Sequence, residues 1–209
     1  MRNENRTLRL AVLFSGTGRT LENLQEKIAR GEIPARIVLA LASGSECGGI
    51  ARARRLGLPL EIVDRRAHPD RKRFDERILR ALEAHPADLV CLAGWLYLFP
   101  LPAEWRGRVL NIHPALLPRH GGRGFHGERV HRAVLEAGEK ESGCTVHLAD
   151  DRYDHGPTVL QRRVPVLPGD TPDTLGTRVF AEECIAYPEA VRAFAAGTIP
   201  GQALPPVRP

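Results

Sequence analysis

Short aliphatic runs that alternate with amphipathic segments constrain the fold of this chain more than any other feature of its sequence. The runs comprise residues 8–14, 36–42, 60–63 and 88–93. Their length and composition are typical of strands that are buried on both faces of a sheet. After the first run, Leu21, Leu24 and Ile28 lie on one face of a predicted helix, and Gly31 marks its expected end.

Two more helices are expected between the later runs. The first carries Ala51 and Leu56. The second has apolar residues at every fourth position from Phe74 to Leu82, and Asp70 is placed to cap it. Strands that alternate with helices in this way predict a parallel sheet with helices on both faces. Ligands are then expected at the loops that follow the carboxyl ends of the strands.

The second half of the chain is less regular. Residues 109–112 predict a short strand that leads into a segment rich in proline and glycine, and a helix is expected over residues 126–136. Two strands, at residues 144–148 and 158–166, are joined by an acidic loop that is too short for a crossover helix. We therefore expect these two strands to pair antiparallel.

A long helix is expected over residues 172–194, and Pro188 is expected to bend or break it. Together these elements predict an α/β fold of the Rossmann-like class. Its sheet is mostly parallel and twisted, with helices on both faces and an antiparallel strand near the C-terminal half. A proline-rich tail, residues 200–209, is expected to fray.

Charge and composition exclude several classes of function. The 30 basic and 25 acidic residues give a net charge of +5, which suits an anionic partner. The arginines are scattered without an aromatic-interleaved basic block, so an anionic small molecule is favoured over nucleic acid. No apolar run approaches the ~20 residues of a membrane helix, and the N-terminus lacks a signal-like stretch, so we expect a cytoplasmic protein. The four cysteines are too widely spaced to predict a zinc site or a disulfide framework: Cys47, Cys91, Cys144 and Cys184.

The loop SGTG at residues 15–18 stands between the first strand and the first helix. The free backbone N–H groups of Gly18, Arg19 and Thr20 at a helix start favour an anion. A dinucleotide fingerprint would need glycine in place of Leu21, and a phosphate loop of the G-K-[ST] type is absent. Two interpretations stay open here: a cradle for a monophosphate, and a tight turn without a ligand.

Asn111 and His113 project to the same side of their strand because side chains alternate along a strand. They stand at its carboxyl end, before an irregular glycine-rich loop, where ligand-binding groups are expected. A His–Pro pair with a purely structural role is the alternative interpretation.

Carboxylates gather in the turn at residues 150–156. Such a cluster costs stability through repulsion unless something uses it. We expect Asp151 to be solvated, whereas Asp154, at the mouth of a strand, is the stronger functional candidate. Glu183 lies on the predicted apolar face of the last helix, where a carboxylate needs a partner. That partner is either a substrate hydroxyl or amine, or an internal arginine.

Taken together, these features resemble the phosphoribosylglycinamide formyltransferase family, the folate-dependent enzymes of purine synthesis. The resemblance extends over residues 8–200. It rests on the segments FSGTGRTLENL, DLVCLAGW, NIHPALLPRHGG, GCTVHLADDRYDHGPTVLQ and VPVLPGDTPDTL, which occur in the family's order. It implies transfer of the formyl group of 10-formyltetrahydrofolate to the amine of glycinamide ribonucleotide.

The resemblance also implies roles for individual residues. Asn111, His113 and Asp154 match the family's catalytic trio. The ribonucleotide-binding positions are Gly18, Arg19, Thr20 and Glu183. The folate-binding positions are Arg71, Leu96, Tyr97, Leu98, Phe99, Asn111, Asp150 and Asp151.

Formyl transfer passes through a tetrahedral carbon that bears an oxyanion. The Asn111 amide and a protonated His113 are expected to donate hydrogen bonds to that oxygen. A nearby Asp154 is expected to raise the pKa of His113 and to take the proton released by the attacking amine. This scheme requires no metal and no covalent nucleophile.

The chain departs from the family pattern in three places. Tyr97 stands where some members carry arginine, the loop at residues 119–127 is longer than in the shortest members, and His155 replaces a small residue. The family also suggests that the Leu117–Pro118 peptide bond is cis.

We expect one domain over residues 1–209, with a phosphate-binding half at 8–105 and a catalytic and folate-binding half at 106–200. Its expected partners are small molecules, without nucleic acid or membrane, in a monomer or homodimer. A formyltetrahydrofolate deformylase and a methionyl-tRNA formyltransferase are the nearest alternatives, and each would usually bring an extra domain for which the chain leaves no room. A Rossmann-like phosphate-binding module is the non-enzymatic alternative, but it gives no reason for the catalytic trio.

Overall fold

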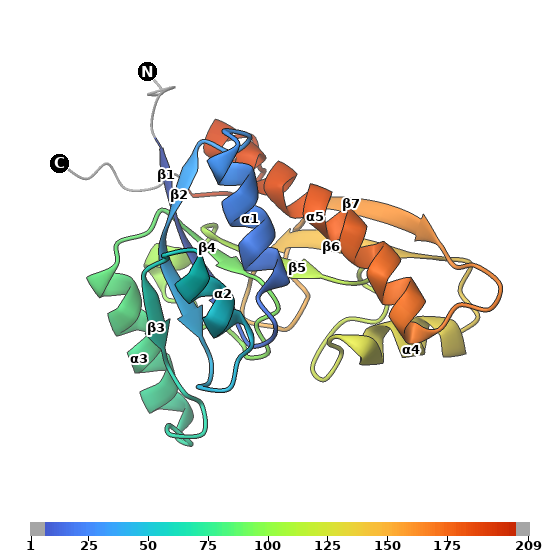
Figure 1. Ribbon diagram of the computed structural model, residues 1–209, viewed down its shortest axis with the longest axis horizontal. Helices are drawn as coiled ribbons and strands as arrows, with labels where there is room; N and C mark the ends of the chain where they lie inside the picture. Colours follow the sequence, from blue (N-terminus) through green and yellow to red (C-terminus); the bar gives the residue numbers. More distant parts are fainter. Residues whose placement is uncertain (1–6, 204–209) are drawn as a thin grey trace.

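The computed structural model describes residues 7–203, which form one seven-stranded sheet flanked by helices (Figure 1). Most of the tail that was expected to fray, residues 204–209, lies outside the described residues. The part that is described is held in place: the Ala203 N–H donates to the Gly107 carbonyl at 3.0 Å, and the Gln202 side chain accepts from the Ile199 N–H at 2.9 Å.

The sheet is mostly parallel, as predicted. Its strands are β1 (Leu8–Phe14), β2 (Ala35–Ala42), β3 (Leu60–Ile62), β4 (Leu89–Leu92), β5 (Val109–His113), β6 (Glu141–Leu148) and β7 (Thr158–Pro165). The spatial order is β3-β2-β1-β4-β5-β6-β7, and β1 to β5 run parallel. Strand β6 is antiparallel to both β5 and β7, which confirms the pairing expected from the short acidic loop.

Helices cover both faces of the sheet. They are α1 (Arg19–Ala29), α2 (Gly49–Arg55), α3 (Arg71–Ala84), α4 (Glu128–Glu136) and α5 (Pro172–Ala196), with a short 3₁₀ turn at Ala103–Trp105. Helices α1, α2, α4 and α5 contribute to one buried cluster, whereas α3 packs into a second cluster that contains Trp95 and Trp105. In Figure 1, α1 and α5 lie in front of the sheet. This arrangement confirms the Rossmann-like α/β fold.

Helix ends follow the local chemistry of the sequence. The Asp70 side chain accepts a hydrogen bond from the Arg73 N–H at 2.8 Å, so the predicted cap of α3 is confirmed. Helix α4 begins at Glu128, two residues later than expected, because Gly127 has a φ of 53° that is incompatible with a helix.

Pro188 does not break the last helix, since α5 runs unbroken from Pro172 to Ala196. A proline inside a helix leaves the carbonyl four residues earlier without its donor. That carbonyl belongs to Cys184, and it accepts instead from the Asn23 side-chain amide on α1 at 3.1 Å. The proline is therefore compensated by the neighbouring helix.

Candidate active site

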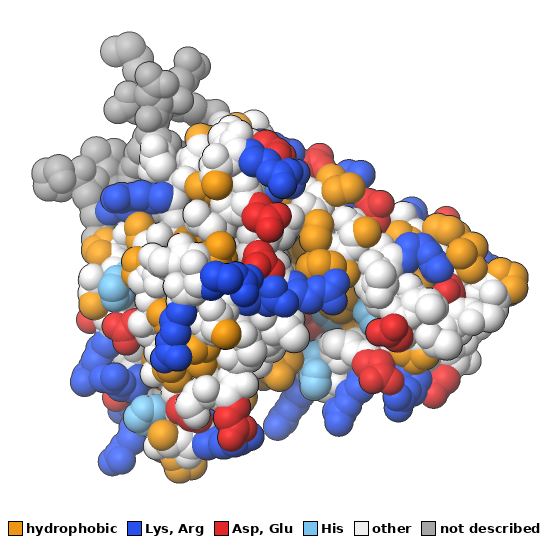
Figure 2. Space-filling model, viewed as in Figure 1, with side chains coloured by type: hydrophobic (Ala, Val, Ile, Leu, Met, Phe, Trp, Pro, Cys, Tyr) orange, Lys and Arg blue, Asp and Glu red, His pale blue; other side chains and the backbone are white. Residues whose placement is uncertain are grey.

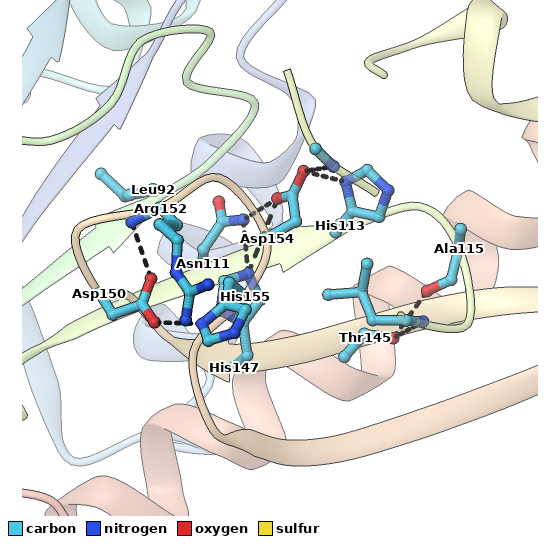
Figure 3. Close-up of polar contacts among 12 residues, drawn as sticks. Leu92, Asn111, His113, Ala115, Thr145, His147, Asp150, Arg152, Asp154 and His155 are labelled. Atoms are coloured by element: carbon cyan, nitrogen blue, oxygen red, sulfur yellow. Dashed lines mark hydrogen bonds and ion pairs between the residues drawn. The ribbon is translucent and has the colours of Figure 1, made fainter. Parts of the chain in front are cut away.

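Asn111, His113 and Asp154 lie together, as the sequence predicted (Figure 3). Strand β5 presents Asn111 and His113, and the loop between β6 and β7 carries Asp154. The Asn111 amide nitrogen donates to Asp154 Oδ1 at 3.1 Å, and His113 Nδ1 is 3.5 Å from Asp154 Oδ2. The His113 side chain is 4% exposed and that of Asp154 is 10% exposed, so this cluster is largely shielded from water.

The backbone around Asp154 is itself held in an uncommon conformation. Asp154 has a φ of 52°, in the left-handed region that non-glycine residues rarely adopt. Its Oδ2 accepts a hydrogen bond from the Gly122 N–H at 2.9 Å, which ties the β6–β7 loop to the long loop before α4. The Leu117–Pro118 peptide bond in that loop is cis, as the family resemblance suggested.

His147 is a further member of this cluster that the sequence analysis missed. Its Nδ1 lies 2.9 Å from the Leu148 carbonyl, an acceptor, so Nδ1 carries the proton and Nε2 accepts from the Asn111 amide at 2.9 Å. With its bond to Asp154, both N–H bonds of the Asn111 amide are thereby used. A signal for His147 was available in the sequence. Side chains alternate along β6, and antiparallel pairing of β6 with β5 places His147 opposite Asn111.

The pKa of His113 differs from what the sequence suggested. Burial lowers the pKa of His113 below its ordinary value, and this outweighs the opposing effect of the nearby Asp154 carboxylate. Asp154 acts on this pKa in the expected direction, but the expected net rise is not found because burial is the larger effect. His113 Nε2 lies 2.8 Å from the His120 carbonyl, to which it donates.

Asp154 is held in its ionised form. Burial by itself would raise the pKa of Asp154, but His147, His113 and the Gly122 N–H together hold that pKa below its usual range. The pKa values of both groups therefore lie below their ordinary values, that of His113 because of burial and that of Asp154 because of its partners. This pair is suited to receiving a proton in a buried site.

A cleft of about 740 Å³ connects this cluster with the loop between β1 and α1. Its wall includes Asn111, His113 and Asp154 together with Gly18, Arg19, Thr20 and Glu183. Every catalytic and ribonucleotide-binding residue expected from the sequence therefore lines one cavity. That volume is in the range of small-molecule sites.

The β1–α1 loop is shaped by close backbone packing. Gly18 has a φ of 75°, and a Cβ there would lie 2.6 Å from the Cα of Gly49. Within residues 7–203, the N–H groups of Gly18, Arg19 and Thr20 have no acceptor, and they stand at the start of α1. The Arg19 guanidinium lies over the Phe180 ring, 3.6 Å from the ring centroid. The loop thus offers free N–H donors and one cation to an anionic group.

Glu183 lies on the face of α5 that borders the cleft. Burial raises its pKa to about 7, although the positive charge of Arg19 opposes the shift. No hydrogen bond or ion pair engages its carboxyl group in the described part of the chain, so the alternative of an internal arginine partner is not realised. The carboxyl group is therefore without a protein partner among residues 7–203, at the wall of the cleft.

The expected folate-binding residues are only partly brought together. Leu96 lines the cleft and is 42% exposed. Tyr97 instead packs edge-on against Phe74 and Trp95, with ring centroids 5.3 and 5.6 Å apart. Its aromatic ring thus joins the buried cluster beneath α3.

The other expected folate-binding residues are arranged around the cleft rather than in its wall. Phe99 is buried, and Leu98 is bonded through both its backbone groups. The Arg71 guanidinium bonds to Asp75 and to the Leu98 carbonyl. Asp150 pairs with His155 at 2.6 Å, and Asp151 is exposed, as expected.

Two further properties of the described residues concern metal-holding groups of side chains and helices that could span a membrane. In this part of the chain, no group of three or more histidine, cysteine, aspartate or glutamate side chains is arranged to hold a metal ion. No helix among residues 7–203 has the length and apolar character needed to cross a membrane.

Comparison with known proteins identifies the family. The formyl transferase family model matches residues 8–191. The chain belongs to the formyl transferase family. Glycinamide ribonucleotide transformylase 1 from Symbiobacterium toebii has 39% sequence identity and a TM-score of 0.83, and the alignment covers 97% of this chain and 95% of that one. For the phosphoribosylglycinamide formyltransferase of Brucella melitensis, the identity is 37%, the TM-score 0.81 and the coverage 96% and 100%.

Other members of the formyl transferase family are longer than this chain. The chloroplastic phosphoribosylglycinamide formyltransferase of Arabidopsis thaliana is 38% identical over 194 residues, which are 91% of this chain and 66% of the plant protein. The trifunctional purine biosynthetic protein adenosine-3 of Gallus gallus is 38% identical over 194 residues. There the match covers 92% of this chain but 19% of the chicken protein.

Proposed function

We propose that this formyl transferase moves the formyl group of 10-formyltetrahydrofolate to the amine of glycinamide ribonucleotide in purine biosynthesis. One observation carries the proposal. Asn111, His113 and Asp154 form a contacting cluster in the wall of the same cleft that reaches the free N–H groups before α1. The named relatives of similar length, from Symbiobacterium toebii and Brucella melitensis, support this choice of substrate.

The ribonucleotide occupies the end of the cleft at the β1–α1 loop. Its phosphate accepts from the N–H groups of Gly18, Arg19 and Thr20, where the helix dipole favours an anion. The Arg19 guanidinium, held over Phe180, adds a charge-assisted donor. Glu183 receives a hydroxyl or amine of the same substrate, because its carboxyl lacks another partner and the cleft reaches it.

The folate occupies the other end of the cleft, against residues 96–99 and the loop that carries Asp150, Asp151 and Asp154. Within the described chain, the backbone groups of Tyr97 and Phe99 have no hydrogen-bonding partner and remain for a heterocycle. Arg71 does not line the cleft, but its guanidinium holds this segment by donating a hydrogen bond to the Leu98 carbonyl. Residues 8–105 thus bind the phosphate, and residues 106–200 supply the catalytic trio and the second folate-binding loop.

The chemistry needs a donor for the oxyanion and an acceptor for a proton. The amine nitrogen attacks the formyl carbon, the carbonyl electrons move to oxygen, and the bond to N10 of the folate then breaks. Asn111 and His113 donate to the oxyanion once one Asn111 N–H leaves His147 or Asp154, and His113 Nε2–H leaves the His120 carbonyl. Asp154 accepts the proton of the attacking amine, directly or through water, and N10 of the folate regains a proton as it leaves.

The proposal also covers the co-substrate, the partners, the oligomeric state and the cellular location of the protein. Formyl folate is the co-substrate, and no metal takes part in this scheme. Figure 2 shows basic and acidic side chains interspersed over the visible face, without the continuous basic surface that nucleic acid favours. We propose a cytoplasmic monomer or homodimer acting on small molecules.

An assay of tetrahydrofolate release from 10-formyltetrahydrofolate, with and without glycinamide ribonucleotide, tests the proposed function. We expect release only when the ribonucleotide is present. Equal release without it would identify a deformylase instead. No release under either condition would leave a binding module and overturn the transferase.

A further inference from the structure

Tyr153 joins the two parts of the cleft that face the proposed folate site. Its phenol oxygen accepts a hydrogen bond from the Leu98 N–H at 3.1 Å, across 55 positions of sequence. Leu98 belongs to the segment that follows β4, whereas Tyr153 belongs to the β6–β7 loop. Tyr153 also lines the cleft, so this link lies at the site itself.

The segment at residues 96–99, which donates this bond, has two further anchors: Ser15, which follows β1, and Arg71 on α3. The Leu96 N–H donates to the Ser15 hydroxyl at 3.1 Å, and the Arg71 guanidinium donates to the Leu98 carbonyl at 2.7 Å. Within residues 7–203, Tyr153 makes the one side-chain hydrogen bond from the β6–β7 loop to residues 96–99. Loss of this bond would free the segment from the loop without removing its other anchors.

The same loop positions the Asp154 carboxylate. Asp154 directly follows Tyr153 and has a φ of 52°, so its conformation depends on how its neighbours are held. On its other side, His155 Nδ1 pairs with Asp150 Oδ2 at 2.6 Å, within the loop. A Cβ on Gly156 would lie 1.9 Å from the Leu148 carbonyl oxygen, so the loop closes tightly against β6. Tyr153 is thus the anchor that connects this compact loop to the opposite wall.

We propose that Tyr153 is a positioning residue: its hydroxyl sets the spacing between the segment 96–99 and the Asp154 carboxylate. The inference rests on the proposed function, because it assigns the folate to this part of the cleft. Folate affinity and the rate of proton transfer then depend on one hydroxyl group that touches neither reacting atom. The ribonucleotide, bound at the β1–α1 loop, is insensitive to it.

The substitution Tyr153→Phe tests this role because it keeps the ring and removes the hydroxyl. We expect KM for 10-formyltetrahydrofolate to rise about fivefold to tenfold, which corresponds to the loss of one net hydrogen bond. We expect kcat to fall as well, and KM for the ribonucleotide to stay within a factor of about two of the wild-type value. Tyr153→Leu, which also removes the ring, is expected to raise the folate KM at least as much.

Tyr187→Phe is the matched control. The Tyr187 hydroxyl lies in the core and donates to the carbonyls of Leu92 and Leu110, at 3.1 and 2.9 Å, away from the β6–β7 loop. We expect this variant to lose thermal stability and to keep the wild-type folate KM. The inference is overturned if Tyr153→Phe leaves the folate KM unchanged, raises both KM values equally, or resembles Tyr187→Phe in losing stability alone.

Calorimetric binding of tetrahydrofolate to the same variants separates this inference from the proposed function. Should the wild-type protein bind tetrahydrofolate but fail to formylate the ribonucleotide, the proposed function fails. The role of Tyr153 is then decided by affinity alone: weaker binding in Tyr153→Phe than in Tyr187→Phe supports it, and equal binding contradicts it. A wild-type protein that binds no tetrahydrofolate overturns both.

Discussion

Asp154 contacts every other member of the catalytic cluster, and its partners come from β5, β6 and the loop before α4. It accepts from the Asn111 amide and the Gly122 N–H, and it faces the His113 ring. Burial would raise the pKa of this carboxyl group, but His147, His113 and the Gly122 N–H hold it below its usual range. At the scale of single residues, the site is a buried anion beside a buried imidazole.

His113→Ala removes the imidazole that is proposed to donate to the oxyanion. We expect kcat to fall about 10²–10³-fold, the usual effect of losing one such donor. Ribonucleotide affinity, measured by calorimetry, is expected to be nearly unchanged because the phosphate binds at the β1–α1 loop. A kcat close to that of the wild-type protein would exclude His113 from catalysis.

Asp154→Asn removes the proton acceptor while keeping the size of the side chain. The pKa of Asp154 is lowered, so this carboxylate accepts protons at neutral pH and loses that ability only in acid. We therefore expect the rate of the wild-type protein to fall in acid, and this limb of the pH–rate profile to be lost or displaced in the variant. An unchanged profile would refute the proton-acceptor role.

Thr20→Glu places a negative charge at the start of α1, where the phosphate is proposed to bind. Repulsion between the carboxylate and the phosphate is expected to weaken ribonucleotide binding in calorimetry. Ala84→Glu, on the exposed end of α3, makes the same change of charge away from the cleft and is expected to bind normally. Equal affinity in the two variants would place the phosphate elsewhere.

At the scale of elements, the pattern within one strand or helix correctly predicted its local structure. Contacts in which one element satisfies a group of another could not be predicted from such patterns. The alternation of side chains along β5 correctly predicted that Asn111 and His113 lie on one side of that strand. By contrast, nothing local to α5 shows that Asn23, 161 positions away, satisfies the carbonyl that Pro188 leaves free. His147 was missed for a related reason, since its role appears only when β6 pairs with β5.

The compensation of Pro188 can be tested by a double substitution. Asn23→Ala leaves the Cys184 carbonyl without its donor, so we expect a loss of about 1–2 kcal/mol in the free energy of unfolding, measured in urea. In Asn23→Ala/Pro188→Ala, residue 188 regains its N–H and supplies the helical bond, so much of that loss is expected to be recovered. Additive effects of the two substitutions would show that the Asn23 contact does not compensate the proline.

At the scale of the whole molecule, the sequence predicted the class of fold and the position of the cleft because strand–helix alternation restricts the topology. The long-range meeting of Asp154 with β5 was implied by the family resemblance and not by any local pattern. The net direction of the His113 pKa was also beyond sequence reasoning, because it depends on how deeply the ring is buried. Burial and proximity act on it in opposite directions, and burial prevails.

Buried histidines make the stability of the folded molecule depend on pH. Burial lowers the pKa of His113 and, together with the charge of His113, that of His131, so the unfolded chain binds more protons than the folded chain in mild acid. We expect the free energy of unfolding to fall as the pH drops below about 6.5, the ordinary histidine pKa. The lowered pKa of Asp154 adds a further loss at pH values below about 4.

Urea unfolding of His131→Gln between pH 7 and 5 isolates this effect from the catalytic histidine. We expect a shallower dependence of stability on pH than in the wild-type protein. His126→Gln, at an exposed position, is expected to keep the wild-type slope. Identical slopes in all three proteins would show that burial of His131 does not govern acid stability.

The path of a labelled formyl carbon tests the proposed reaction most directly. With 10-formyltetrahydrofolate labelled at that carbon, we expect the label to appear in the amide of formylglycinamide ribonucleotide, with one tetrahydrofolate released for each labelled product. Label recovered as formate, or a product that forms equally well in Asp154→Asn and His113→Ala proteins, would contradict a transfer carried out by this cluster.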